Sequence, residues 1–183
     1  MTFGVETDEA EAFAQLDRFR EAGGTLIDTA DVYGDGESER IIGRWLAERR
    51  PDPGELLLAT KGRFAPPEGM AGASRPALEA AIEASLDRLG VDHVDLIQLH
   101  NLVDPDEWDV AFAAGGAVEA LALAQEEGLV KDIGVTGHGV PIARAGENLD
   151  DQPSGVVEKT VALVAARAVI AELDALQVPE QDR

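Results

Sequence analysis

Short apolar runs alternate with longer amphipathic segments from the amino terminus to about Val135, and this alternation limits the fold more than any other feature of the sequence. Two parallel strands need a crossover between them, usually a helix, and such helices then cover the strands. The sequence therefore predicts an α/β fold built from parallel βα units. The runs short enough to be buried strands are Thr25–Ile27, Leu56–Ala59, Val94–Leu99 and Ile133–Val135.

Helices are predicted between these runs, because apolar residues recur there three to four positions apart. Ser74 followed by Arg75-Pro76 predicts the start of one helix, and Gly90 predicts its end. A later helix is predicted over Ala117–Glu127. The apolar faces of the other helices are Ala12, Phe13, Leu16 and Phe19; Ile41, Ile42, Trp45 and Leu46; and Leu78, Ile82, Leu86 and Leu89.

The alternation stops after Pro141. The segment Glu147–Ser154 is polar and contains a proline, which predicts a linker. The Val- and Ala-rich stretch Val156–Leu176 follows, and its apolar spacing favours one long helix over strands. We therefore expect residues 1–141 to form the strand–helix units and residues 142–183 to form a linker and a C-terminal helix.

The charge of the chain argues against two classes of partner. With 15 basic and 36 acidic residues, the formal net charge is −21, which repels the phosphates of nucleic acids and anionic membrane surfaces. The most apolar stretch, Val156–Leu176, contains charged residues such as Glu158 and Arg167, which are costly in hydrocarbon. Neither a nucleic-acid partner nor a membrane span is expected.

Cysteine is absent from the sequence, so a disulfide framework and a cysteine metal site are excluded. The acidic residues around Asp31 do not match a calcium loop, because Tyr33 and Ile42 would occupy ligand positions in it. No metal site is therefore predicted. The first residues, MTFGVETDEAEAF, lack the basic and apolar regions of a signal peptide, so a cytoplasmic location is expected.

Polar side chains follow three of the predicted strands and would meet at the carboxyl end of the sheet. Asp28 and His100 end two strands, Lys61 ends the strand between them, and Tyr33 lies in the loop after Asp28. Each residue alone has an ordinary reading as a turn cap, a half-buried aromatic, a solvated strand end or a rim residue. Together they form a combination with a specific chemical use.

That use is the donation of a proton to a substrate oxygen. Tyr33 would be the general acid, and the Lys61 cation would stabilise the anion left when a phenol gives up its proton. Asp28 would pair with Lys61 and aim it. His100 would donate a hydrogen bond to a carbonyl oxygen and complete a small oxyanion-binding site.

Four segments in order resemble the signatures of aldo-keto reductases: GTLIDTADVYGDGESERIIG, LLLATKG, LDRLGVDHVDLIQLHN and EEGLVKDIGVTGH. The resemblance covers about residues 1–141. It implies a (β/α)8 TIM barrel and reduction of a small-molecule aldehyde or ketone. The implied cofactor is NADP(H) in preference to NAD(H). It also implies that Asp28, Tyr33, Lys61 and His100 are the catalytic residues.

The sequence departs from this family in two ways. A barrel of this type needs about 250 residues, whereas this chain has 183 and shows no strand–helix units after Gly139. Residues 1–141 would therefore be a partial barrel of about five parallel strands, counting a remnant at Met1–Gly4. The family commonly has a Ser-Asn pair that holds the nicotinamide amide, and Thr136-Gly137 stands there. Thr136 is thus the one cofactor-binding residue that the resemblance implies.

Several alternatives remain open at this point. The chain is either a carbonyl reductase or a non-catalytic remnant that serves as an interaction or regulatory subunit. An interrupted barrel exposes strand edges. Either the Val156–Leu176 helix covers its own half-barrel in a monomer, or it joins a homodimer that buries the open edges, which we favour. Trp108 and Phe112, in the loop expected after His100, are candidates for the wall of a substrate pocket, and His138 is a candidate substrate contact.

Overall fold

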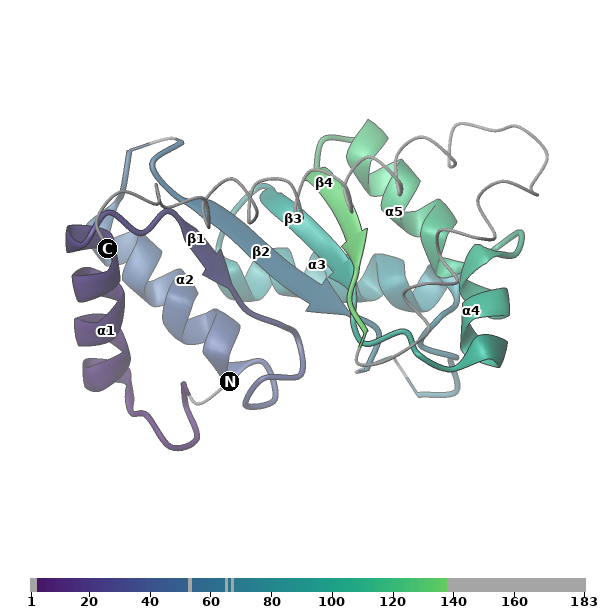
Figure 1. Cartoon of the computed structure of the whole chain (residues 1–183), viewed down its shortest axis with the longest axis horizontal. Helices are drawn as coiled ribbons and strands as arrows, with labels where there is room; N and C mark the ends of the chain where they lie inside the picture. Colours follow the sequence, from purple (N-terminus) through teal and green to yellow (C-terminus); the bar gives the residue numbers. More distant parts are fainter. Residues whose placement is uncertain (1–2, 53, 65, 67, 138–183) are drawn as a thin grey trace, which may run out of the picture.

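The computed structural model describes residues 3–52, 54–64, 66 and 68–137, and the structural statements below concern these residues (Figure 1). The predicted linker and C-terminal helix at residues 142–183 lie outside this range, as does His138.

Four strands form a single parallel sheet in chain order: β1 (Leu26–Asp28), β2 (Leu57–Gly62), β3 (Val94–Leu99) and β4 (Val130–Val135). The register pairs Asp28 with Ala59 and Lys61 with Gln98. Each crossover contains at least one helix. The predicted α/β class and the predicted strands are therefore confirmed.

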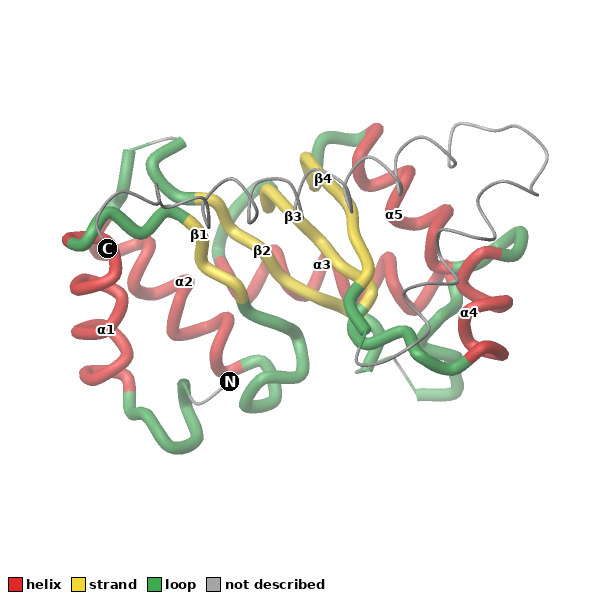
Figure 2. The backbone as a smooth tube through the Cα atoms, in the orientation of Figure 1, coloured by secondary structure: helices red, strands yellow, loops and turns green. Residues whose placement is uncertain are grey.

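The predicted helices are also present: α1 (Glu9–Glu21), α2 (Glu37–Arg49), α3 (Arg75–Leu89) and α5 (Ala117–Glu126). Helices α2 and α3 lie together on one face of the sheet, and α5 packs against α3 and β4 (Figures 1 and 2). The helix α4 (Pro105–Phe112) precedes α5. The described residues thus form a layer of strands backed by a layer of helices.

Helix α4 corrects the expectation that a loop follows His100. Trp108 and Phe112 lie on this helix, and their rings stack with centroids 4.5 Å apart. The helix begins as helices commonly do, because the Asp104 side chain accepts a hydrogen bond from the Asp106 N–H and Pro105 occupies the first position. These start signals were present in the sequence. The helix itself has only eight residues, which is too short for its apolar spacing to indicate a helix.

The core lies between the sheet and the helices. Ile27, Ile97 and Ile133 project from the strands on this side and are almost fully buried. They share one cluster with large side chains of the helices, namely Trp45, Leu78, Ile82, Leu89 and Leu121. Burial of a large apolar side chain contributes about 1.5–3 kcal/mol, so this interface is the main source of stability.

The strand count is four in the described residues. Of the expected remnant at Met1–Gly4, the described residues Phe3 and Gly4 do not join the sheet. Phe3 instead pairs with Thr7 in an isolated bridge, and the Gly4 N–H donates to the Thr7 carbonyl over 2.9 Å, so this part of the chain turns back on itself.

Part of the face of the sheet opposite the core is accessible, although Ala59 and Lys61 on this face are buried. Leu26 and Leu57 are partners in the β1–β2 register, and they are 50% and 45% exposed. Asp28, two residues after Leu26, shares this face because side chains alternate along a strand. No helix among the described residues is long and apolar enough to cross a membrane.

Candidate active site

The five residues predicted to act in the site lie at the carboxyl ends of the strands. Asp28 is the last residue of β1, Lys61 is the penultimate residue of β2, and His100 and Thr136 directly follow β3 and β4. Tyr33 is in the loop between β1 and α2, which the Asp31 N–H ties to the Lys61 carbonyl at 3.0 Å. The structure therefore brings them to one end of the sheet, as the strand positions predicted.

Lys61 is the buried centre of this group, with its side chain 6% exposed. Its ammonium donates to Asp28 Oδ2 over 2.6 Å and to the Thr29 carbonyl over 2.8 Å. It also lies 5.2 Å from the centroid of the Tyr33 ring, within the range of a cation–π contact. A buried cation is thus held between a carboxylate and a phenol.

His100 contacts the other side of the same tyrosine. The two ring centroids are 5.7 Å apart, and the planes meet at 85°, an edge-to-face arrangement. The His100 N–H donates to the Gly62 carbonyl over 3.0 Å, which extends the β2–β3 pairing beyond the strand. The backbone of His100 is therefore fixed beside the end of β2, and Tyr33 contacts both Lys61 and His100.

Thr136 connects the ends of β3 and β4. Its hydroxyl accepts a hydrogen bond from the Asn101 N–H at 2.8 Å and lies 3.5 Å from the Leu99 carbonyl. Its backbone N–H donates to the same carbonyl at 2.9 Å. The residue predicted to bind cofactor is therefore also part of the local backbone structure, with one acceptor position of its hydroxyl left over.

Two further polar residues in this region were not predicted from the sequence. The Gln98 amide lies on the accessible face of β3, 3.5 Å from Asp28 Oδ1. Arg63 follows β2 and directs its guanidinium to the carbonyls of His100 and Asn101, both at 2.8 Å. A polar residue within the apolar run of β3 was a signal for Gln98. Arg63 resembled an ordinary solvated residue after a strand.

A second acidic group lies behind the site, on the helical side. Asp31 is 4% exposed, and burial raises the pKa of its carboxyl above the ordinary value. Glu39 adds to this rise and is itself fully buried, where it accepts from Thr60 Oγ1 and Arg88 Nε, each at 2.6 Å. The buried charge of Glu39 is thus compensated by Arg88. The charge of Asp31 is stabilised mainly by backbone N–H groups, which lower its pKa but do not offset the effect of burial.

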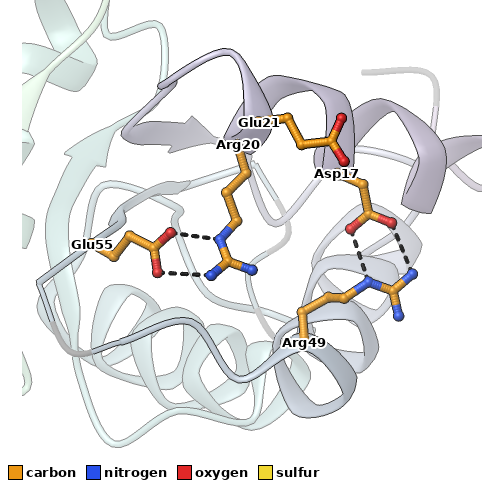
Figure 3. A pocket seen from close by; sticks show the side chains of 5 residues that line it. All are labelled: Asp17, Arg20, Glu21, Arg49 and Glu55. Carbon is orange, nitrogen blue, oxygen red and sulfur yellow. Dashed lines mark hydrogen bonds and ion pairs between the residues drawn. The ribbon is translucent and has the colours of Figure 1, made fainter.

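A surface hollow of about 410 Å³ lies at the opposite end of the strands (Figure 3). Its charged groups already bind one another: Arg20 pairs with Glu55, and Arg49 pairs with Asp17. The hydrogen bonds from Arg49 and Trp45 lower the pKa of Asp17 to about 2. We assign it no ligand. Within the described part of the chain, no group of three or more acidic or histidine side chains is arranged to hold a metal ion.

Comparisons with known proteins agree with the geometry. A sequence model of the aldo/keto reductase family matches residues 1–153. The chain is 37% identical over 133 residues to the norsolorinic acid reductase stcV of Emericella nidulans, covering 68% of this chain and 33% of that protein. It is 36% identical over 125 residues to the uncharacterized oxidoreductase YrpG of Bacillus subtilis, covering 62% of this chain and 38% of the relative.

A solved structure with the same fold is the holo form of aldo-keto reductase AKR11C1 from Bacillus halodurans. It superposes with a TM-score of 0.60 at 32% identity, covering 79% of this chain and 46% of that one. The four-stranded sheet therefore corresponds to part of a (β/α)8 barrel of this type. The chain spans about a third to two-fifths of the length of these two curated relatives. On the match to most of its length, the chain belongs to the aldo/keto reductase family.

Proposed function

We propose that this chain belongs to an oxidoreductase that reduces an aldehyde or ketone, with Tyr33 as the general acid. The observation that carries the proposal is the buried Lys61 ammonium, which contacts Asp28 on one side and the Tyr33 ring on the other. A relative named a norsolorinic acid reductase supports the reaction class.

Each of the four residues has a defined task in this reaction. Tyr33 gives its hydroxyl proton to the carbonyl oxygen of the substrate, and Lys61 stabilises the phenolate that remains. Asp28 pairs with the Lys61 ammonium and directs it toward the tyrosine. His100, whose ring meets Tyr33 edge to face, donates a hydrogen bond to the same carbonyl oxygen and stabilises the negative charge that develops there.

The residues at the strand ends have the chemistry to hold the nicotinamide part of a dinucleotide. The Gln98 amide both donates and accepts hydrogen bonds, and the Thr136 hydroxyl has one acceptor position left, so these two side chains would hold the carboxamide. When bound, NADP(H), or less readily NAD(H), supplies the hydride. The described cations at this end, Lys61 and Arg63, already bind carboxylates or carbonyls, so the phosphates would have to contact other residues.

The second candidate function is a non-catalytic subunit, and the accessible pair Leu26 and Leu57 favours it. Two half-exposed leucines on the sheet face that carries Asp28 form an apolar surface suited to another protein surface. A homodimer that covers this face remains our proposal for the chain in solution. Light scattering of wild type and Leu26→Lys at micromolar concentration tests it, because a charge at the interface should yield monomer.

The experiment that separates the two functions combines cofactor binding with turnover. NADPH is titrated into the protein and followed by nicotinamide fluorescence, and reduction of a panel of aromatic aldehydes and ketones is then measured. Tyr33→Phe keeps the ring against Lys61 and His100 but removes the proton donor. We expect its turnover to fall by about 10²–10⁴ with NADPH affinity unchanged.

Two results would contradict the proposal. Turnover of Tyr33→Phe at the wild-type rate would exclude Tyr33 as the acid. A folded wild-type protein that neither binds NADPH nor reduces any member of the panel would favour the non-catalytic subunit.

A further inference from the structure

Arg63 connects three elements that carry the proposed site. It follows β2 two residues after Lys61, and its side chain is only 4% exposed. Nε donates to the His100 carbonyl and Nη2 donates to the Asn101 carbonyl, each at 2.8 Å. Nη1 forms an ion pair with Glu107 in the first turn of α4. One guanidinium therefore joins the end of β2 to the end of β3 and to the helix that carries Trp108.

The backbone of Arg63 is strained. Its φ of 135° lies in the region that favours glycine, where an arginine backbone is strained. Asn101, whose carbonyl Arg63 binds, also has a positive φ of 52°. Such conformations persist only where surrounding contacts hold them. The three interactions of the guanidinium are the contacts that hold this one.

Gly72 lies against the backbone of Arg63. A Cβ added to Gly72 would collide with the Arg63 carbonyl oxygen, so the two backbones approach closely here. This close approach is a further restriction on the Arg63 backbone.

Arg63 also reaches the His100 ring through Phe64. Its guanidinium carbon lies 4.2 Å from the centroid of the Phe64 ring, and that ring meets the His100 ring edge-on at 5.0 Å. The imidazole therefore contacts the rings of both Tyr33 and Phe64. Arg63 fixes His100 twice, by its backbone carbonyl and by the neighbouring aromatic ring.

We propose that Arg63 is a positioning residue, which sets the direction of the His100 imidazole relative to Tyr33. The importance of that direction for reaction rests on the proposed function, but the direction itself can be measured without turnover. Arginine suits the task because its rigid planar fork presents N–H groups on separate nitrogens to the two carbonyls, whereas the donors of lysine all share one nitrogen on a flexible stem.

The test follows the ring protons of His100 by NMR. The chain contains three histidines, and the His100 signal is assigned by its loss in His100→Gln. Rings packed edge-on displace this signal from its value in an unfolded chain. In Arg63→Lys we expect most of the displacement to be lost while the His93 signal stays in place. Glu107→Gln is the matched control, because it removes one partner of Arg63 and leaves both carbonyl contacts, so its His100 signal should remain close to wild type.

Arg63→Gly provides a second variant in case the lysine variant does not fold. Glycine accepts the positive φ without strain, so this variant relaxes the backbone while removing the guanidinium. The same loss of the His100 displacement is expected. A folded Arg63→Gly protein with the wild-type His100 signal, even with a lower melting temperature, would reduce Arg63 to a purely structural role and overturn the proposal.

The outcome is distinguishable from failure of the proposed function. If wild type shows no reductase activity but the His100 signal responds to Arg63, the positioning role stands and the reductase assignment fails. If wild type is active and the signal does not respond, only the positioning role fails. In an active enzyme, Arg63→Lys should lower kcat more than it raises KM, because the misdirected hydrogen bond matters most in the transition state.

Discussion

Lys61 and Asp28 form an ion pair of 2.6 Å in which the ammonium is 6% exposed and the carboxylate is 48% exposed. Lys61 therefore loses most of its hydration on folding, whereas Asp28 keeps about half of its exposure. Without the carboxylate, the Thr29 carbonyl would be the remaining described hydrogen-bond acceptor of the ammonium. A buried charge is tolerated only when it is compensated. The pair is thus a requirement of the fold as well as an arrangement that suits the proposed chemistry.

Removal of Asp28 should cost more stability than removal of Lys61. Asp28→Asn leaves an uncompensated buried ammonium and is expected to lower the free energy of unfolding by about 1.5–3 kcal/mol. Lys61→Met fills similar space without a charge and should cost less. Urea unfolding of the two single variants and the double variant gives the coupling free energy between Asp28 and Lys61. Additive losses would show that the ion pair contributes nothing to the fold.

Gly43→Ala should separate two helices. A Cβ at Gly43 in α2 would lie 2.5 Å from the Arg88 carbonyl oxygen and 2.7 Å from that of Leu89, at the end of α3. Backbone atoms cannot give way as side chains do, so a loss of about 1–3 kcal/mol in unfolding free energy is expected from thermal or urea unfolding. Glu48→Ala, on the exposed side of α2, is the control and should stay close to wild type. An equally stable Gly43→Ala variant would mean that the two helices are further apart than described.

The pH dependence of unfolding should report Asp17. Hydrogen bonds from Arg49 and Trp45 lower the pKa of Asp17 from 3.8 to about 2. A carboxyl whose pKa is lower in the folded state contributes stability above its ordinary pKa and loses it as the pH falls toward the lowered value. The slope of unfolding free energy against pH, measured between 3.8 and about 2, should therefore decrease in Asp17→Asn. An unchanged slope would place the acid sensitivity in other carboxyl groups.

The sequence was sufficient for those features that depend on spacing. The strands followed from short apolar runs, and the common location of Asp28, Lys61 and His100 followed from the rule that parallel strands end at one edge. The role of Arg63 was not visible, because a positive φ at a non-glycine residue and a contact across 37 positions leave no local pattern. Helix α4 was missed because its eight residues are too few to establish a helical period.

The burial of Asp31 was not predicted from the sequence, where this residue was considered only as part of a calcium loop that was rejected. In the structure it is buried, and neither carboxylate oxygen has a hydrogen-bond partner of acceptable geometry among the described residues. The neighbouring Glu39 raises its pKa further, while the Val32 and Arg63 N–H groups and the Arg88 cation oppose the rise. A sequence cannot show this, because the burial depends on contacts between segments that are distant in the chain.

Asp31→Asn should stabilise the protein at neutral pH. Burial raises the pKa of Asp31 above 3.8, so the folded state binds this proton more tightly than the unfolded state does. The contribution of Asp31 to stability is therefore greatest below pH 3.8 and is lost as the pH rises through the raised pKa. Asparagine has nearly the same shape and no charge, so it removes the cost of a buried carboxylate. We expect a higher melting temperature than wild type at pH 7, and a difference that shrinks as the pH falls from the raised pKa toward 3.8. Asp92→Asn, which changes an exposed carboxylate, is the control and should show neither effect. A lower melting temperature for Asp31→Asn at neutral pH would mean that the carboxylate gains more from the Val32 and Arg63 N–H groups than it loses by burial.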